Sequence, residues 1–155
     1  APRFHARLNA VRKTYVYRIW NAPVRNVFRR RFTTWIQKPL DLDAMEQAAT
    51  LLCGTHDYRA FCSLKKFKKS TVRTVEEMNI EHLGKEIRIS YTGDGFLYHM
   101  VRILTGTLVE VGEGARKPED MPTILMSMDR ANAGKLMPPE GLTLECVEYE
   151  DNLKK

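Results

Sequence analysis

Polar and apolar residues alternate along residues 12–21, whose sequence is RKTYVYRIWN. Successive side chains of a β-strand point to opposite faces, so this pattern assigns each residue to one of two faces. One face would carry Lys13, Tyr15, Tyr17 and Ile19, and the other would carry Arg12, Thr14, Val16, Arg18 and Trp20. The stretch is rich in β-branched and aromatic residues and ends at Asn21-Ala22-Pro23, so it predicts a strand followed by a turn.

Apolar residues next recur at helical spacing within LDLDAMEQAATLLCG, residues 40–54. Asp41 is a favourable N-cap for this stretch, and Gly54 is a favourable C-cap. The predicted buried stripe consists of Met45, Ala48, Leu51 and Leu52. We therefore predict a helix that begins after Asp41 and ends before Gly54.

The rest of the pattern predicts a hairpin, two helices and a last strand. The expected elements are strands at 72–80 and 86–91, a helix ending near 111, a short helix at 118–128 and a strand from about 142. This order is typical of an α+β fold, in which an antiparallel sheet carries helices on one face. We treat residues 1–155 as a single domain, because a chain of this length buries a core without disulfides.

One charged residue, Arg102, lies inside the apolar helical pattern of GDGFLYHMVRILTG, residues 93–106. At about 100° per residue, one apolar arc contains Met100, Val101, Leu104, Leu108 and Val111. Arg102 points away from this arc, beside Thr105, Gly106 and Val109. A helix face open to water would carry several charges, but only Glu110 lies near the edge of this one.

No residue at helical spacing from Arg102 offers it a carboxylate. The four positions that would meet it are Tyr98, His99, Thr105 and Gly106. A buried guanidinium without a partner is costly, so Arg102 either reaches the surface or finds a partner elsewhere. Three interpretations stay open: a structural ion pair, exposure to solvent and a functional role.

Two tyrosines, Tyr15 and Tyr17, share one face of the first predicted strand, flanked by Arg12, Lys13 and Arg18. Aromatic rings interleaved with positive charge suit unstacked nucleotides. The same rings also suit a hydrophobic core, and both interpretations stay open. Asp94 stands in a Gly-Asp-Gly turn, where turn geometry favours aspartate; a nucleophilic role there is the minor alternative.

Positive charge is concentrated in the first part of the chain. The net charge is +6, and residues 1–40 contain ten Lys or Arg and no Asp or Glu. A second basic cluster, KKFKK at residues 65–69, falls in a predicted loop, whereas residues 140–151 contain five acidic residues. This segregation favours a nucleic-acid partner, because each neutralised phosphate releases counterions. An anionic membrane or an acidic protein is the alternative partner.

The sequence offers no sign of a metal site or a disulfide framework. Cys53, Cys62 and Cys146 form no CxxC pair, and the four histidines lack metal-ligand spacing. We therefore expect no metal, and a reducing compartment, the cytoplasm. No run approaches the about 20 apolar residues of a membrane helix, so we expect no membrane-spanning segment. Of the partners that the charge allows, we expect nucleic acid and no membrane.

Five blocks follow one another along almost the whole chain. They are FHARLNAVRKTYVYRIWN, GTHDYRAFCS, TVRTV, GDGFLYHMVRILTGTLVEVG and DRANAGKLMPPEGLTL. In order and spacing these blocks resemble the C-terminal half of the tRNA pseudouridine synthase A family. The segments KTYVYRI and GFLYHMVR, with GTLVEVG after them, carry the most specific part of the resemblance.

The resemblance implies an enzyme that isomerises uridine to pseudouridine in the anticodon stem-loop of tRNA, without cofactor or metal. In this family the target base is flipped out of the RNA, and an aspartate performs the key attack. By the same resemblance, Tyr15 stacks on the target base and Leu97 forms an apolar wall of the active site. Arg102 corresponds to the arginine that forms an ion pair with the catalytic aspartate. A flipped base needs an aromatic face to offset its lost stacking.

The catalytic aspartate has no counterpart in this sequence. The family carries it in an Arg-Thr-Asp motif of the N-terminal half, and no such motif occurs here. We therefore expect a C-terminal half that is inactive alone and, like the family, forms a homodimer. Phe4, His5 and Arg7 match the block that enters this half, and the basic stretches would face the RNA backbone. The alternative is a non-catalytic RNA-binding module.

Overall fold

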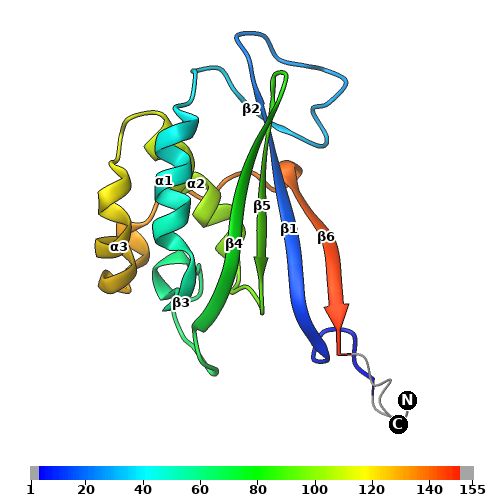
Figure 1. Cartoon of the computed structure of the whole chain (residues 1–155), viewed down its shortest axis with the longest axis vertical. Helices are drawn as coiled ribbons and strands as arrows, with labels where there is room; N and C mark the ends of the chain where they lie inside the picture. Colours follow the sequence, from blue (N-terminus) through cyan, green and yellow to red (C-terminus); the bar gives the residue numbers. More distant parts are fainter. Residues whose placement is uncertain (1–3, 151–155) are drawn as a thin grey trace.

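A computed structural model of the chain describes residues 4–150, which form a sheet and a group of helices (Figure 1). The strands are β1 (Ala10–Asn21), β2 (Thr34–Ile36), β3 (Gly54–Asp57), β4 (Val72–Leu83), β5 (Glu86–Gly93) and β6 (Leu142–Tyr149). The helices are α1 (Leu42–Leu52), α2 (Met100–Gly112) and α3 (Met121–Ser127). Short 3₁₀ turns lie at Arg59–Phe61, Pro118–Asp120, Arg130–Asn132 and Pro139–Gly141. No helix within residues 4–150 is long and apolar enough to cross a membrane.

The strands form one sheet in the order β2-β1-β5-β4-β3, and β6 pairs with β1 along the same edge as β2. The helices lie together on one side of the sheet (Figure 1), so the predicted α+β class is confirmed. The predicted antiparallel pairing holds for every strand pair except one: β2 runs parallel to β1, with Thr34 beside Ile19. β2 and β3 were not predicted, because strands of three and four residues are too short to show alternation.

Strand β1 has the two faces that its alternation predicts. Tyr17 and Ile19 are fully buried against the helices, together with Ile89 and Tyr91 of the neighbouring β5. The residues that point away from the helices are more polar, although Val16 among them is also buried. The sheet therefore has one apolar face under the helices and a second face that carries arginines and threonines.

Helix α1 begins as predicted, because the carboxylate of Asp41 accepts a hydrogen bond of 3.0 Å from the backbone N–H of Ala44. Two details of the prediction are wrong. Leu51 is 42% exposed, and Ala49 is buried in its place. The C-cap is Cys53, whereas Gly54 opens β3 with φ +110°, a conformation that favours glycine.

Helix α2 is buried on nearly all sides, which explains the missing charges around Arg102. Its inner side packs in the core, and residues 133–137 cover the opposite side. A Cβ placed on Gly106 would lie only 1.8 Å from the carbonyl oxygen of Lys135. The backbone N–H of Gly134 donates to Thr107 Oγ1 at 2.9 Å. The second face of α2 therefore meets backbone rather than water.

Candidate functional site

A cavity of about 190 Å³ lies between the N-terminal end of α2 and strands β1 and β6. Tyr15, Leu97 and Arg102 all line it, so the structure brings together the three residues singled out in the sequence. The other lining residues are Phe96, His99, Met100, Val101, Pro139 and Leu142. Apart from Arg102 and His99, this lining is apolar or aromatic.

The turn after β5 brings Phe96 and Leu97 to this cavity. A Cβ on Gly93 would meet the carbonyl oxygen of Thr74 at 2.6 Å, so the close approach of β4 requires glycine. Asp94 fixes the same contact: its carboxylate accepts from the N–H of Thr74 at 2.9 Å, and its own N–H donates to the Thr74 carbonyl at 3.1 Å. Asp94 does not line the cavity. The structure therefore gives Asp94 the turn-forming role.

Arg102 is half-buried and is held by backbone rather than by a carboxylate. Its Nε donates to the carbonyl oxygen of Met137 at 2.6 Å, and the N–H of Met137 donates back to the Arg102 carbonyl at 3.3 Å. Within residues 4–150, no Asp or Glu oxygen forms an ion pair with Arg102. The structural ion pair considered for Arg102 is therefore not formed in the described part of the chain. Arg102 lines the cavity, and among residues 4–150 its terminal nitrogens form no hydrogen bond.

The two tyrosines of β1 have different environments. Tyr17 is fully buried, and its hydroxyl lies 2.6 Å from both Thr34 Oγ1 and the Pro138 carbonyl oxygen. Burial is the main reason that the pKa of Tyr17 rises to about 12. Tyr15 is only partly buried and meets Phe96 edge to face, with ring centroids 5.3 Å apart. Tyr17 is thus a core aromatic, and Tyr15 is the tyrosine that faces the cavity.

His99 is a cavity residue that the sequence did not single out. It has a left-handed backbone conformation, φ 63°, directly before α2 begins. Its Nδ1 lies 3.0 Å from Ser63 Oγ, and its ring stacks on Tyr98 with a centroid distance of 3.7 Å. Desolvation, followed by the positive charges of Arg102 and Arg130, lowers the pKa of His99. A non-glycine residue in this conformation is uncommon and often marks a functional site.

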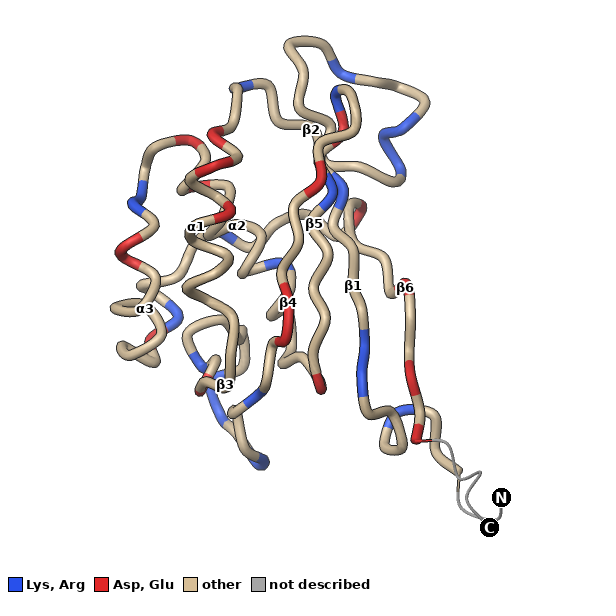
Figure 2. The backbone as a smooth tube through the Cα atoms, viewed as in Figure 1, with Lys and Arg blue, Asp and Glu red and all other residues tan. Residues whose placement is uncertain are grey.

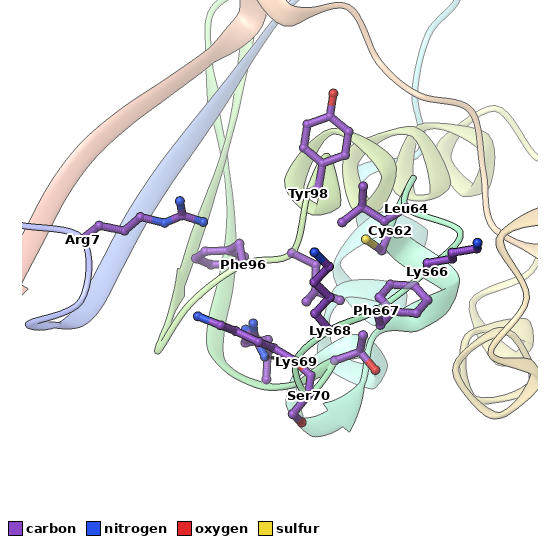
Figure 3. A pocket seen from close by; sticks show the side chains of 13 residues that line it. Arg7, Cys62, Leu64, Lys66, Phe67, Lys68, Lys69, Ser70, Phe96 and Tyr98 are labelled. Carbon is purple, nitrogen blue, oxygen red and sulfur yellow. Dashed lines mark hydrogen bonds between the residues drawn. The ribbon is translucent and has the colours of Figure 1, made fainter.

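A larger cleft of about 520 Å³ is drawn in Figure 3. It adjoins the cavity, because Phe96 and Leu97 line both spaces. Its five cationic residues come from the segment before β1, the loop after the first 3₁₀ turn and β4: Arg7, Lys66, Lys68, Lys69 and Arg73. The remaining lining contributed by residues 4–150 is mostly apolar or aromatic, and it includes no Asp or Glu. Arg59 lies over the ring of Phe67 in the basic loop, 5.0 Å from its centroid. The predicted basic loop at residues 65–69 therefore forms one wall of the cleft.

The three residues at the N-terminal end of the matching blocks separate in space. Arg7 reaches the larger cleft, as Figure 3 shows. Phe4 instead meets Tyr149 edge to face at 5.0 Å. The N–H of His5 donates to Asn9 Oδ1 at 2.6 Å, which holds a local turn. Only Arg7 therefore belongs to the candidate site.

The joined cavity and cleft suit a planar base and phosphate groups better than they suit acid–base chemistry. They offer aromatic faces at Tyr15, Phe96 and Tyr98, and cations along the rim. Aromatic rings and positive charges are the features that hold single-stranded nucleic acid. Within the described part of the chain, no carboxylate lines either space. Among residues 4–150, no group of three His, Cys, Asp or Glu side chains has the geometry of a metal site.

Comparison with known proteins gives the class of the chain. A family model described as tRNA pseudouridine synthase matches residues 48–150. The chain therefore belongs to the tRNA pseudouridine synthase family.

Individual relatives carry a more specific name, tRNA pseudouridine synthase A. The relative from Brevibacillus brevis is 49% identical over 146 residues, which cover 94% of this chain and 60% of that protein. The relative from Geobacillus kaustophilus is 45% identical over 148 residues, 96% of this chain and 57% of that protein. The relative from Moorella thermoacetica is 46% identical over 149 residues, 96% of this chain and 61% of that protein. The chain thus spans about 60% of the length of the relatives that it matches.

Proposed function

We propose that this chain is the substrate-binding part of a tRNA pseudouridine synthase that acts on uridines of the anticodon stem-loop. The observation that carries the proposal is that Arg102 lines a mainly apolar cavity to which no residue of 4–150 contributes a carboxylate, while its Nε is held by the Met137 carbonyl. An N-terminal segment with an Arg-Thr-Asp motif would supply the aspartate that forms an ion pair with Arg102. The active site would then form between the two parts.

In this proposal Arg102 keeps the catalytic aspartate ionised. An apolar cavity disfavours a charged carboxylate, and a guanidinium within a few ångströms restores the charged form. Arg102 is held at Nε by the Met137 carbonyl, so its position is set before the aspartate arrives. Preorganised charge of this kind stabilises developing charge without reorganisation during the reaction.

Tyr15 and Leu97 would hold the target base. Tyr15 offers its ring to the flipped uracil, because its edge-to-face contact with Phe96 fixes the ring and leaves it partly exposed. Leu97 closes the cavity with an apolar surface. Stacking against an aromatic face offsets part of the cost of removing the base from the RNA.

The proposed reaction conserves all atoms of the nucleotide. The bond between N1 of uracil and C1′ of the ribose breaks, and a bond between C5 and C1′ forms. The proton of C5 is lost and N1 gains a proton, so no oxidant, reductant or group donor is consumed. The proposal accordingly invokes no cofactor and no metal.

Two further features of the proposal concern the whole protein. We propose a homodimer, supported by the exposed apolar side chains of the loop between β1 and β2. Three of these, Val24, Val27 and Phe28, are 61–90% exposed. We propose the cytoplasm as its location, supported by the free thiols of Cys53, Cys62 and Cys146.

Release of tritium from an anticodon stem-loop labelled at C5 of uridine tests the proposed function. The purified 155-residue chain should release none, because it contains no Arg-Thr-Asp motif. An N-terminal segment carrying this motif, added in trans or by fusion, should restore release. Turnover by the chain alone would refute the division of the site between two parts. RNA binding without restored turnover would instead favour a non-catalytic RNA-binding module.

A further inference from the structure

The face of the sheet that points away from the helices carries an unusual pair of arginines. Arg18 of β1 and Arg88 of β5 stand directly opposite each other on neighbouring antiparallel strands. Like charges in this arrangement destabilise a sheet. A partner must therefore compensate for their repulsion.

One buried carboxylate compensates only part of this charge. Glu86, whose side chain is 5% exposed, lies 3.0 Å from Nη2 of Arg88 and 3.1 Å from Nη1 of Arg29. Arg18 makes no contact with Glu86, and its Nη1 donates to Thr143 Oγ1 at 3.1 Å. Two guanidinium groups thus share one carboxylate, and the third, that of Arg18, forms no ion pair within residues 4–150. Glu81 stands on the other side of Arg88 in the sheet, but it forms no ion pair with Arg88.

On the same face of the sheet, the positive charge of Arg12 is compensated by two carboxylates. Arg12, at the opposite end of β1, lies 3.1 Å from both Glu76 and Glu148. Two carboxylates therefore surround one guanidinium there. The end of the sheet that carries Arg18 and Arg88 keeps an excess of positive charge, and Figure 2 shows Lys and Arg gathered near β2.

The three arginines surround a hollow of about 390 Å³, which we call the arginine hollow. Its lining residues are Arg18, Arg29, Phe32, Thr33, Glu86 and Arg88. The loop between β1 and β2 closes one side, and Arg29 of this loop lies over the ring of Trp20, 6.0 Å from its centroid. The hollow is therefore built from two strands and a loop that is fixed to them.

The arginine hollow and the candidate active site lie on opposite faces of the sheet. Tyr15 shares the face of Tyr17 and Ile19, which are buried under the helices, whereas Arg18 points to the other face. The two spaces have no lining residue in common. An RNA hairpin whose loop fills the cavity would leave the hollow to a different part of the substrate.

We propose that the arginine hollow is a second RNA-binding site, which takes phosphate groups of tRNA outside the anticodon arm. Guanidinium groups bind phosphate oxygens through paired N–H donors, and after their contacts with Glu86 and Thr143 the three arginines keep such donors unused. This inference rests on the proposed function, because it takes tRNA as the polyanion. It adds a contact that distinguishes whole tRNA from its isolated stem-loop.

Fluorescence anisotropy with two labelled RNAs, a complete tRNA transcript and an isolated anticodon stem-loop, tests the proposal across a KCl series. The variant is Arg18→Gln, because Arg18 has no role in holding Glu86. Arg31→Gln is the matched control. Arg31 is exposed on the loop between β1 and β2 and does not line the hollow. Both variants lose the same charge. Thermal melting followed by circular dichroism checks that each variant is folded.

Arg18→Gln should weaken binding of the complete tRNA about fivefold and lower the slope of log affinity against log salt by about one. It should leave the stem-loop affinity unchanged, and Arg31→Gln should have a smaller effect on both RNAs. Equal effects of the two variants on tRNA would overturn the proposal, as would equal losses for tRNA and stem-loop. A change in oligomeric state with unchanged tRNA affinity would also overturn it, because the hollow would then be a protein interface. If the unmodified chain bound neither RNA, the proposed function itself would fail as well.

Discussion

The middle and the N-terminal end of α2 differ in how completely they are packed. Around Thr105 and Gly106 the helix is closed on every side, with the Lys135 carbonyl directly over Gly106. One turn earlier, Arg102 lines a cavity, and His99 before it has a left-handed conformation. Rigid packing of the middle of the helix holds the N-terminal end in place while leaving it open. The ion pair proposed for Arg102 would need this combination of a fixed position and an accessible face.

Gly106→Ala should cause the largest loss of stability in the packed stretch. A Cβ there would overlap the backbone of Lys135, which cannot move as a flexible side chain would. We expect the free energy of unfolding to fall by about 3 kcal/mol, measured by urea denaturation. Gly95→Ala is the control, because its Cβ would meet Arg73 at an ordinary 3.5 Å. Equal losses for both variants would contradict the account of this packing.

Tyr91→Phe should have a smaller effect on the same stretch. The Tyr91 hydroxyl lies 2.7 Å from Thr105 Oγ1, which itself donates to the Val101 carbonyl. Removing the hydroxyl leaves a buried acceptor without its donor, which costs about 1 kcal/mol. Tyr98→Phe should be nearly neutral, because Tyr98 is 55% exposed. Urea denaturation of both variants measures the difference, and a neutral Tyr91→Phe would show that this hydrogen bond adds nothing.

His99 should give the open end of α2 a small sensitivity to acid. Because its pKa is lowered in the folded state, the unfolded state binds the proton more readily. Stability should therefore fall as the pH drops from about 7.5 to about 5. His99→Asn should reduce this fall, since asparagine tolerates the left-handed conformation without titrating. Melting temperatures at both pH values test this, and an unchanged pH dependence would exclude His99 as its source.

The sequence predicted those features that depend on neighbours along the chain. The alternation of β1 placed Tyr17 and Ile19 in the core, and Asp41 caps α1 as expected. Two features depend on contacts between distant segments: the parallel pairing of β2 with β1 and the packing of Lys135 over Gly106. No local sequence pattern predicts either of them. The exposure of Leu51 likewise depends on which helices pack beside α1.

The candidate site was predictable to a similar extent. Helical spacing indicated that Arg102 has no carboxylate partner on its own helix. In the structure its Nε instead donates to the carbonyl oxygen of Met137, 35 positions away. The resemblance predicted Tyr15 and Leu97 as site residues, and in the structure both line the same cavity as Arg102. His99 was missed because a single histidine carries no spacing pattern. The only sequence feature that could have indicated a role for His99 was its position between the Gly93–Gly95 turn and the start of the helix at Met100.

The most direct test of the account compares turnover and tRNA affinity of Arg102→Ala in the chain combined with an Arg-Thr-Asp-containing N-terminal segment. Lys135→Ala is the control, because Lys135 is an exposed cation that does not line the cavity. We predict that Arg102→Ala lowers tritium release by at least about 10²-fold, with tRNA affinity within about twofold of the unmodified protein. Retained turnover with a steep loss of affinity would contradict the account, since Arg102 would then be a phosphate contact.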